Sequence, residues 1–400
     1  MLSVFCIFFH QKNLHSVYLF ILFRTSPLTV SPLRILYFKV KRKIHIAEAT
    51  WIFLIPRMSI LTIFLDLSIS LPWLGKTWRS HLCADLAEAA RTVSYVESVS
   101  NKADTFHKYI SFSDEIFIKK AYELCIRRIL KKLRITDVSL AIDGKKDLYY
   151  GKHSGLNTRN IKAERGAVAA WEYLVISIVH PVHLPLMAVR YPQGADLASA
   201  CIELLEYARR LPLRIKKIFF DRGFYNGRLL DYLTSKRNKR PLPYLLLVPQ
   251  NNKIKRFIEQ TSGRIGVFKH TLRYTREKST WKSETTIVVC KNAGINSDGK
   301  SYDMVFATNM KPSFSMVKQY KHRWNIETGF RVMEEGKIKT KSNNPIIRLF
   351  YFLLRALFCG LWLLQKIIRA PLTFKAYLRK VEKELRQYFV YKPPPIKPLF

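Results

Sequence analysis

Three acidic side chains, Asp143, Asp221 and Glu327, have the types and positions that metal-dependent chemistry requires. Acids are scarce in this chain, which contains 29 Asp and Glu residues against 68 Lys and Arg residues. Carboxylates drawn from distant parts of a chain, with no competing set of His or Cys, suit hard divalent cations such as Mg²⁺ or Mn²⁺. Two such ions about 4 Å apart can activate an attacking oxygen and stabilise a leaving oxygen in phosphodiester displacement. We therefore predict that all three acids are catalytic and that together they hold two ions.

The segment around Glu327 aligns further polar groups with this acid. If residues 319–335 form a helix, Tyr320 and Glu327 are nearly two turns apart and share one face, with Arg323 between them. A guanidinium can hold a phosphate in its planar fork, and a phenol can hydrogen-bond to a neighbouring phosphate. We predict that Arg323 and Tyr320 contact the phosphates of a nucleic acid.

Each of these acids also has a purely structural explanation. Glu327 could be one partner of an ion pair on a surface helix. Asp143 precedes Gly144 and could be a turn residue, and Asp221 could pair with Arg222. A shared site is the better interpretation, because three independent explanations are needed to replace it.

The charge of the chain indicates a polyanionic partner. The formal net charge is +39, and the basic residues are spread along the sequence rather than gathered in one tail. Nucleic acid is favoured over an acidic membrane, and high solubility or a role on the ribosome is the alternative. The six cysteines are scattered without a Cys-x-x-Cys pair, which argues against a zinc site or a disulfide framework and predicts a reducing, cytoplasmic location.

Residues 1–75 differ from the rest and are predicted to be an atypical hydrophobic leader. The apolar stretch 2–23 is broken by polar residues and makes a poor signal peptide. A second apolar stretch, 51–74, contains Pro56, Arg57 and Asp66, whereas a spanning helix needs roughly 20 mostly apolar residues. A pair of membrane segments is one alternative. The favoured one is that part of the leader is not native protein and that translation starts at Met58 or later.

Helical periodicity follows over residues 76–134, which we predict to be a DNA-binding helical subdomain. Helices are expected over 84–99, 104–110 and 116–133, with a break at Ser100 and basic residues near the end of the third. A small helical bundle with a basic edge is a common DNA-binding arrangement. A generic helical subdomain explains the pattern equally well.

From residue 135 the pattern changes to strands, which are expected over 138–143, 171–179, 184–191 and 215–220. Helices are predicted over 195–210 and after Asp221, up to about residue 236. The order strand, strand, strand, helix, strand, helix is that of a ribonuclease H-like core, an α/β fold with a mixed sheet. In that fold the first and fourth strands are neighbours, so Asp143 and Asp221 are expected to lie together.

The second half of the chain interrupts and then completes this core. Residues 241–310 are predicted to be a β-rich insertion, with strands over 244–248, 266–275, 285–290 and 302–307 and a turn at Asn251–Asn252. The catalytic domain is predicted to comprise 135–240 and 311–368, and 369–400 to be a helix and a proline-rich tail. The helix over 346–368 is apolar apart from Arg355 in its middle; packing against the sheet is favoured over a membrane span.

Three motifs in this chain resemble those of the DDE insertion-sequence transposases. They are Ala-Ile-Asp143-Gly, Phe-Phe-Asp221-Arg-Gly-Phe-Tyr-Asn and Tyr320-x-x-Arg323-Trp-x-Ile-Glu327. The resemblance covers about residues 83–368, and more specifically the motifs resemble those of the cut-and-paste group with a β-rich insertion. The stretch after the third motif, residues 339–351, looks like the archaeal-type branch of this group. It implies DNA strand cleavage at transposon ends, strand transfer into target DNA, dependence on Mg²⁺ and a synaptic dimer.

One position departs from the family pattern. The family has a Lys seven residues after the catalytic Glu, and this chain has Glu334 there. Lys337 and Lys339 are close in sequence, but a continuous helix would turn Lys337 roughly 80° away from the Glu327 face. DNA binding is predicted for these two lysines and for Tyr320, Arg323, Trp324 and Arg222.

Three other functions remain open at this stage. The chain could be an inactive or domesticated DNA-binding descendant of such an element, a membrane protein, or a ribonuclease H-like nuclease that cleaves without joining. The intact acids count against the first. The membrane alternative leaves the acids unexplained, and only the form of the third motif disfavours the nuclease.

Overall fold

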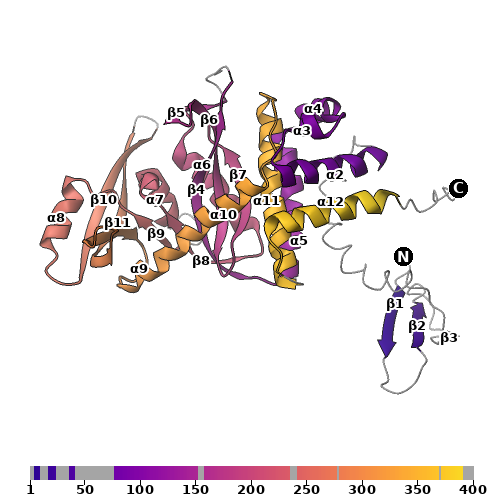
Figure 1. Ribbon diagram of the computed structural model, residues 1–400. Coiled ribbons are helices and arrows are strands. Elements are labelled where there is room, and N and C mark those ends of the chain that lie inside the picture. The colour runs from indigo at the N-terminus through magenta and orange to yellow at the C-terminus, as the bar shows by residue number, and fades with distance from the viewer. Residues whose placement is uncertain are drawn as a thin grey trace. The chain divides into compact units, whose positions relative to one another are not determined.

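The protein is described from a computed structural model (Figure 1). Residues 4–9, 17–23, 36–40, 76–151, 157–234, 241–276, 279–368 and 371–390 are described. The chain divides into two compact units, Met1–Ser59 and Ile60–Phe400.

The first unit contains a small antiparallel sheet with the strand order β1-β2-β3. Its strands are β1 (Val4–Phe9), β2 (Val17–Phe23) and β3 (Leu36–Val40). The apolar stretch 2–23 therefore contains two paired strands. The second stretch, 51–74, and Met58 lie outside the described residues.

The second unit opens with four helices in the region predicted to be helical. They are α2 (Lys76–Thr92), α3 (Val96–Val99), α4 (Ala103–Ser111) and α5 (Glu115–Leu133). The predicted helix over 84–99 is split, because Val93 adopts a positive φ of 54° and ends α2. The Asp114 carboxylate caps α5 by accepting a hydrogen bond from the Ile116 N–H at 3.1 Å.

A mixed sheet forms the centre of the second unit, and its order confirms the predicted ribonuclease H-like core. Five strands run in the order β7-β6-β4-β8-β9, where β4 pairs antiparallel with β6 and parallel with β8. In chain order this is third, second, first, fourth and fifth. The strands are β4 (Asp137–Tyr149), β6 (Ala167–His180), β7 (Leu184–Arg190), β8 (Arg214–Phe220) and β9 (Tyr244–Leu247), with β5 (Arg159–Glu164) added beyond β6.

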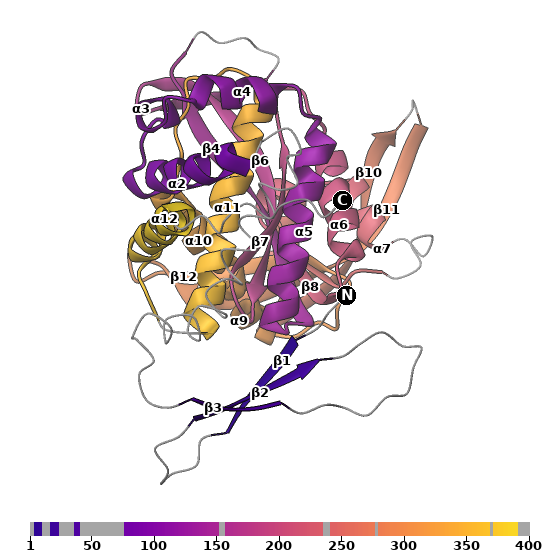
Figure 2. The ribbon, with the colours of Figure 1, turned by 90° about the vertical axis from the view of Figure 1, so that its right-hand side faces the viewer.

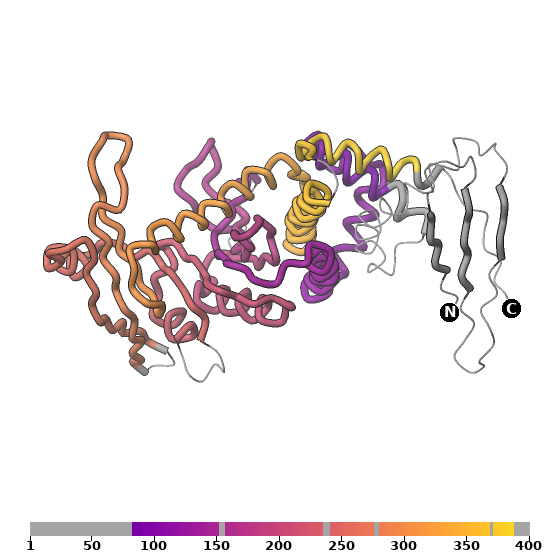
Figure 3. The backbone as a smooth tube through the Cα atoms, turned by 90° about the horizontal axis from the view of Figure 1, so that it is seen from below, coloured from indigo at the N-terminus to yellow at the C-terminus, as the bar shows by residue number. Residues whose placement is uncertain are grey.

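Strand β9 was grouped with the insertion from its sequence, but it pairs in parallel with β8 and is the fifth strand of the core. The later strands continue the same sheet, because β12 pairs with β9. They are β10 (Ile265–Arg276), β11 (Ser279–Ile295) and β12 (Ser301–Thr308). The long β10–β11 ribbon lies at the end of this unit away from α2 (Figure 3). The β-rich segment is thus an extension of one nine-stranded sheet.

The segment between β9 and β10 contains the helix α8 (Asn252–Gln260) where the sequence indicated a turn. The Asn251 side-chain oxygen accepts a hydrogen bond from the Ile254 N–H at 3.0 Å and caps this helix. Asn favours both turns and helix N-termini, because its short side chain bonds the backbone a few residues ahead. The sequence signal at this point was therefore ambiguous.

Helices cover the central sheet and complete the fold. Between β7 and β9 lie α6 (Leu197–Arg210), the one-turn helix η1 (Arg222–Phe224) and α7 (Gly227–Thr234). After β12 come α9 (Ser315–Tyr320), η2 (Lys321–Arg323), α10 (Trp324–Glu335), α11 (Pro345–Ile368) and α12 (Phe374–Val390). Helices α5 and α11 lie side by side and both contact β7 (Figure 2).

Helix α11 is long and apolar enough to cross a membrane by length and composition, and it is the one such helix among the described residues. However, 78% of its most apolar stretch is buried inside the protein. Phe352, Leu357 and Phe358 are each at most 2% exposed. The packing of α11 on α5 and β7 accounts for its apolar composition, as the sequence analysis favoured.

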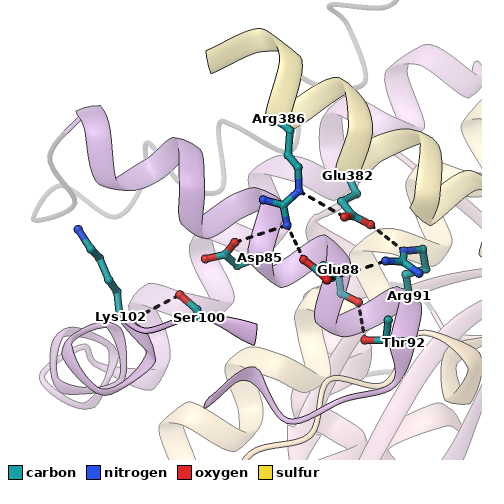
Figure 4. Close-up of polar contacts among 8 residues, drawn as sticks. All are labelled: Asp85, Glu88, Arg91, Thr92, Ser100, Lys102, Glu382 and Arg386. Carbon is teal, nitrogen blue, oxygen red and sulfur yellow. Dashed lines mark hydrogen bonds and ion pairs between the residues drawn. The ribbon is translucent and has the colours of Figure 1, made fainter. Parts of the chain in front are cut away.

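An ion-pair network joins the first and last helices of the second unit (Figure 4). Arg386 of α12 contacts Glu88 and lies 3.8 Å from Asp85, both on α2. Glu382, also on α12, accepts a hydrogen bond from Arg91 Nε at 2.7 Å. The end of the described chain is thereby held against the helical region that precedes the sheet.

Candidate active site

Two of the three predicted catalytic acids lie side by side because their strands are neighbours in the sheet. Ile142 of β4 pairs with Phe220 of β8, and the two strands are parallel. Asp143 and Asp221 follow these residues directly. The apolar residues that precede each acid are buried, so both acids lie at the edge of the hydrophobic core.

The third acid is supplied by an almost continuous helical segment. Helix α9, the turn η2 and helix α10 follow one another without a break, which places Tyr320, Arg323 and Glu327 on one face. Arg323 Nη1 donates a hydrogen bond to Asp143 Oδ2 at 3.2 Å, and Arg323 Nη2 donates one to Glu327 Oε1 at 2.7 Å. The guanidinium therefore lies between an acid of the sheet and an acid of the helix. We call Asp143, Asp221, Arg323 and Glu327 the acid site.

Tyr320 is packed beneath the acid site rather than on the surface. Its side chain is buried, and its hydroxyl donates to the Phe220 carbonyl at 3.1 Å and to Asp221 Oδ1 at 3.4 Å. The ring also lies against Phe306, with the centroids 5.3 Å apart. In this structure, the phenol fixes the end of β8 and the orientation of the Asp221 carboxylate.

Negative charge is in excess at the acid site. Burial raises the pKa of Asp143, and the charges of Asp221 and Glu327 raise it further. The Gly144 N–H and the Arg323 guanidinium act in the opposite direction but do not balance them, so the pKa of Asp143 is about 6. A single cation facing three carboxylates leaves a site that additional positive charge would stabilise.

Among the described residues, no group of three or more His, Cys, Asp or Glu side chains could hold a metal ion as the side chains stand. The Arg323 guanidinium lies between two of the three predicted ligands and contacts both Asp143 and Glu327. The chemistry of the donors nevertheless fits Mg²⁺ or Mn²⁺, since all three are carboxylates and their negative charge is only partly balanced.

A second ionic cluster joins the same strand and helix a short distance from the acid site. It consists of two acids and three cations: Asp147, Glu334, Lys145, Lys337 and Arg355. Arg355 Nη2 lies 3.0 Å from Asp147 Oδ1, and Arg355 Nη1 lies 3.2 Å from Glu334 Oε1. Lys145 contacts Glu334 at 3.1 Å, and Lys337 contacts Asp147 at 3.0 Å. We call these residues the basic cluster.

Positive charge is in excess in the basic cluster, and the pKa of Asp147 reflects it. Burial alone would raise this pKa, but Arg355 and Lys337 outweigh burial and lower it to about 2. Arg355 is 1% exposed and comes from the middle of the apolar helix α11. Its charge is tolerated there because two carboxylates receive its hydrogen bonds.

The basic cluster also accounts for the position at which this chain departs from the family pattern. Glu334 does not lie among the residues of the acid site; its carboxylate is bound by Lys145, Arg355 and, at 3.7 Å, Lys337. Helix α10 ends at Glu335, and the chain then turns Lys337 toward Asp147. Neither Glu334 nor Lys337 contacts Asp143 or Glu327.

The other residues predicted to bind DNA differ in their accessibility. Trp324 is 49% exposed, and Arg222 also lies on the surface, next to Asp221. Lys339 is exposed, but its backbone is engaged: its N–H donates to the Ser94 carbonyl at 2.9 Å, and its carbonyl accepts from the Val96 N–H at 3.0 Å. This link ties the chain after α10 to the helical region at the start of the second unit.

The end of β6 and the loop that follows it hold the first half of α10. Asn325 Nδ2 donates to the Val179 carbonyl at 2.8 Å. The imidazole of His183 lies against Gly329, so that a Cβ atom at position 329 would be 1.8 Å from His183 Cε1. Burial lowers the pKa of His183 to about 4, which keeps this ring neutral near pH 7. The helix can approach the sheet this closely only because residue 329 has no side chain.

The basic cluster was missed because the second half of β4 was not predicted to be a strand. Strand β4 continues to Tyr149, six residues beyond the predicted end, and pairs with β6 over this length. Asp143, Lys145 and Asp147 occupy every second position of this stretch, which points all three to one face. This period-two alternation was a usable signal.

A family model matches part of the chain that contains two of the three acids. Residues 175–359 match the family model described as the transposase DDE domain. This range includes Asp221 and Glu327, whereas Asp143 lies before it and is brought to them by the pairing of β4 with β8. A search of curated proteins found no match.

Among solved structures, the model is similar to a piggyBac transposase in a synaptic complex with hairpin DNA, with 14% sequence identity and a TM-score of 0.47. The match covers 70% of this chain and 59% of that transposase chain. The assignment of the fold rests on the strand order described above.

Proposed function

We propose that this protein is a transposase that binds the ends of a mobile DNA element, cleaves DNA strands there and transfers them into a target, as in cut-and-paste transposition. The observation that carries the proposal is the acid site: Asp143, Asp221 and Glu327 converge on Arg323 within a ribonuclease H-like core. The finer assignment, to the group with a β-rich insertion, rests on the three motifs, and the assignment to its archaeal-type branch rests on residues 339–351, which follow the third motif.

Asp143, Asp221 and Glu327 are the residues that would hold Mg²⁺ or Mn²⁺, as two ions. When bound, such ions activate the attacking oxygen and stabilise the leaving oxygen of a phosphodiester. The chain itself supplies the scaffold: the parallel pairing of β4 and β8 fixes two carboxylates, and α10 brings the third. Tyr320 orients Asp221 through its hydroxyl.

We assign Arg323 to balancing the acids when no DNA is bound and to contacting a phosphate during the reaction. Its side chain is 8% exposed, and its Nε atom has no hydrogen-bond partner among the described residues. A planar guanidinium suits both roles, because carboxylates and phosphates present similar pairs of oxygens. Trp324 and Arg222 are exposed nearby and are proposed to contact DNA.

The net charge of +39 supports DNA as the partner, because each phosphate that a Lys or Arg neutralises releases condensed counterions. The proposed DNA partners are the inverted repeats of the element and a target duplex. A dimer in the synaptic complex and a cytoplasmic, nucleoid-associated location complete the proposal.

The test is a strand-cleavage and joining assay with the purified full chain, Mg²⁺ or Mn²⁺, and DNA that carries the inverted repeats flanking the gene. Wild type is compared with Asp221→Asn and with Asp298→Asn, which changes an exposed acid in the turn after β11. Metal-dependent nicks at the repeat ends, followed by joined products, are expected for wild type and Asp298→Asn only.

Other outcomes would separate the rival functions. Nicks without joined products would favour a ribonuclease H-like nuclease. Binding of the repeat ends without nicks, in wild type as well as in Asp221→Asn, would favour an inactive descendant that only occupies DNA.

A further inference from the structure

We infer that the basic cluster is a positioning device that holds α10 in register with β4 and so sets the separation of Asp143 and Glu327. This inference rests on the proposed function, because it concerns the geometry of the same acid site. Among the described residues, no ion pair or hydrogen bond joins the five residues of the basic cluster to Asp143, Asp221 or Glu327. They act through the elements that carry those acids.

The acid site and the basic cluster connect the same two elements at two matched points. Asp143 and Asp147 lie four residues apart on β4, a distance of about 13 Å along a strand. Glu327 and Glu334 lie seven residues apart on α10, about 10 Å along a helix. A helix attached to a strand at one point can still pivot and slide, whereas two attachments fix both its angle and its register.

Helix α11 makes the attachment at the basic cluster rigid. Arg355 bridges Asp147 and Glu334 from α11, and its guanidinium also stacks on the Phe352 ring at 4.3 Å. Helix α11 is itself fixed by its apolar packing against α5 and β7. The buried guanidinium therefore transmits the position of a rigid helix to both β4 and α10.

Lys145 and Lys337 add further ion pairs to the same two carboxylates, from the strand side and from beyond the end of the helix. Lys145 Nζ contacts Glu334 and lies 5.8 Å from the centre of the Phe330 ring of α10. Lys337, which follows the C-terminus of α10, contacts both Asp147 and Glu334. With three cations around them, both acids of the cluster are bound from several directions, which disfavours alternative registers of the helix.

The experiment measures Mn²⁺ binding to the full chain without DNA, from the electron paramagnetic resonance signal of free Mn²⁺. Glu334→Gln removes one charge from a side chain that is 39% exposed, so the variant is expected to fold. Loss of residues that orient metal ligands typically weakens metal binding 10- to 100-fold, and we expect about 10-fold here. Glu335→Gln is the matched control, because it makes the same change at the next, exposed position of α10.

A second variant separates positioning from the general effect of charge. Lys337→Met removes a cation, so simple electrostatics predicts tighter binding of Mn²⁺, whereas a positioning role predicts weaker binding. Mn²⁺ affinity reduced in both Glu334→Gln and Lys337→Met, with Glu335→Gln unchanged, supports the inference. In the DNA cleavage assay, Glu334→Gln should nick the repeat ends about 10-fold more slowly or worse. The affinity of this variant for DNA that carries the repeat ends should change less than about 3-fold.

Two results would overturn the inference. If wild type and Glu334→Gln bind Mn²⁺ equally well, the basic cluster does not position the acid site, although the proposed metal site itself stands. If wild type binds no Mn²⁺, the metal site is wrong and the inference fails with it.

Discussion

Asp143 and Asp147 lie four residues apart on one face of β4, and both are largely buried, yet their pKa values move in opposite directions. Burial acts to raise both, but the pKa of Asp143 is about 6 and that of Asp147 about 2. The difference comes from their neighbours. Asp143 faces two further carboxylates and one guanidinium, whereas Asp147 faces Arg355 and Lys337.

This contrast shows how charge balance distinguishes a site that favours a cation from a site that stabilises the fold. The acid site is short of positive charge, which favours the binding of a cation. In the basic cluster, three cations already balance the two carboxylates, so these interactions stabilise the fold. The two regions would be hard to separate by burial or by residue type, because each combines carboxylates of β4 and α10 with a buried arginine.

The sharpest way to break the comparison is to neutralise each aspartate in turn. Asp147→Asn leaves Arg355 buried without its main partner, and loss of one member of a buried pair costs about 3–5 kcal/mol. Asp143→Asn removes charge from a site with excess negative charge and should change the free energy of unfolding by less than about 1 kcal/mol. Urea unfolding at pH 7 in the absence of metal measures both values.

Equal destabilisation by the two substitutions would mean that the two clusters do not differ in the way described. DNA cleavage by the two variants is the complementary measurement. Asp143→Asn should abolish DNA cleavage although the protein remains folded.

A second prediction concerns Gly329, which lies on α10 between the two clusters. A Cβ at this position would be 1.8 Å from His183 Cε1, so Gly329→Ala must displace either the imidazole or the helix. Overpacking of this kind costs about 1–3 kcal/mol, and it should also slow cleavage because Glu327 moves with α10. Thermal unfolding and the nicking assay test both effects.

Thr328→Ala is the control for this substitution, because Thr328 is exposed on the same helix. If Gly329→Ala melts at the wild-type temperature, the close approach of α10 to the β6–β7 loop is wrong.

A third prediction concerns a dependence on pH that belongs to the basic cluster. The pKa of Asp147 is lowered in the folded state, so its ionised form contributes stability that is present above its unfolded pKa of about 3.9. This contribution, on the order of 2 kcal/mol, is lost as the pH falls toward 2. The destabilisation caused by Asp147→Asn should therefore shrink by about 2 kcal/mol between pH 5 and pH 2. A constant difference over this range would show that Arg355 and Lys337 do not stabilise the ionised carboxylate.

The sequence was sufficient to predict the core and the meeting of its acids. Asp143 and Asp221 each follow an apolar run, and the order of strands and helices indicated that these runs are neighbours. The spacing of Tyr320, Arg323 and Glu327 indicated a shared helical face. These features depend on local periodicity and chain order, which a sequence displays directly.

The sequence did not reveal how the charged residues divide between two clusters. Arg355 appeared only as an interruption of an apolar helix, because its partners Asp147 and Glu334 are distant in the chain. Lys337 was judged by helical geometry, yet α10 ends before it and the chain turns. Pairings of this kind depend on how α10, α11 and β4 pack together, which residue periodicity does not encode.

Strand β9 illustrates the same limit within the fold. Residues 244–247 read as a strand, but nothing local distinguishes a fifth core strand from the first strand of an insertion. Only the pairing of β9 with β8 on one side and β12 on the other resolves its place.

The most direct test of the contrast between the two clusters is to locate bound Mn²⁺ by anomalous X-ray diffraction from crystals of the full chain soaked in Mn²⁺. Asp143→Asn crystals treated in the same way serve as the comparison. The charge balance predicts Mn²⁺ within coordination distance of Asp143 and Asp221 in wild type, a weaker or absent signal in Asp143→Asn, and none at Asp147 or Glu334. Mn²⁺ bound at the basic cluster, or an acid site without Mn²⁺ in wild type, would contradict the account.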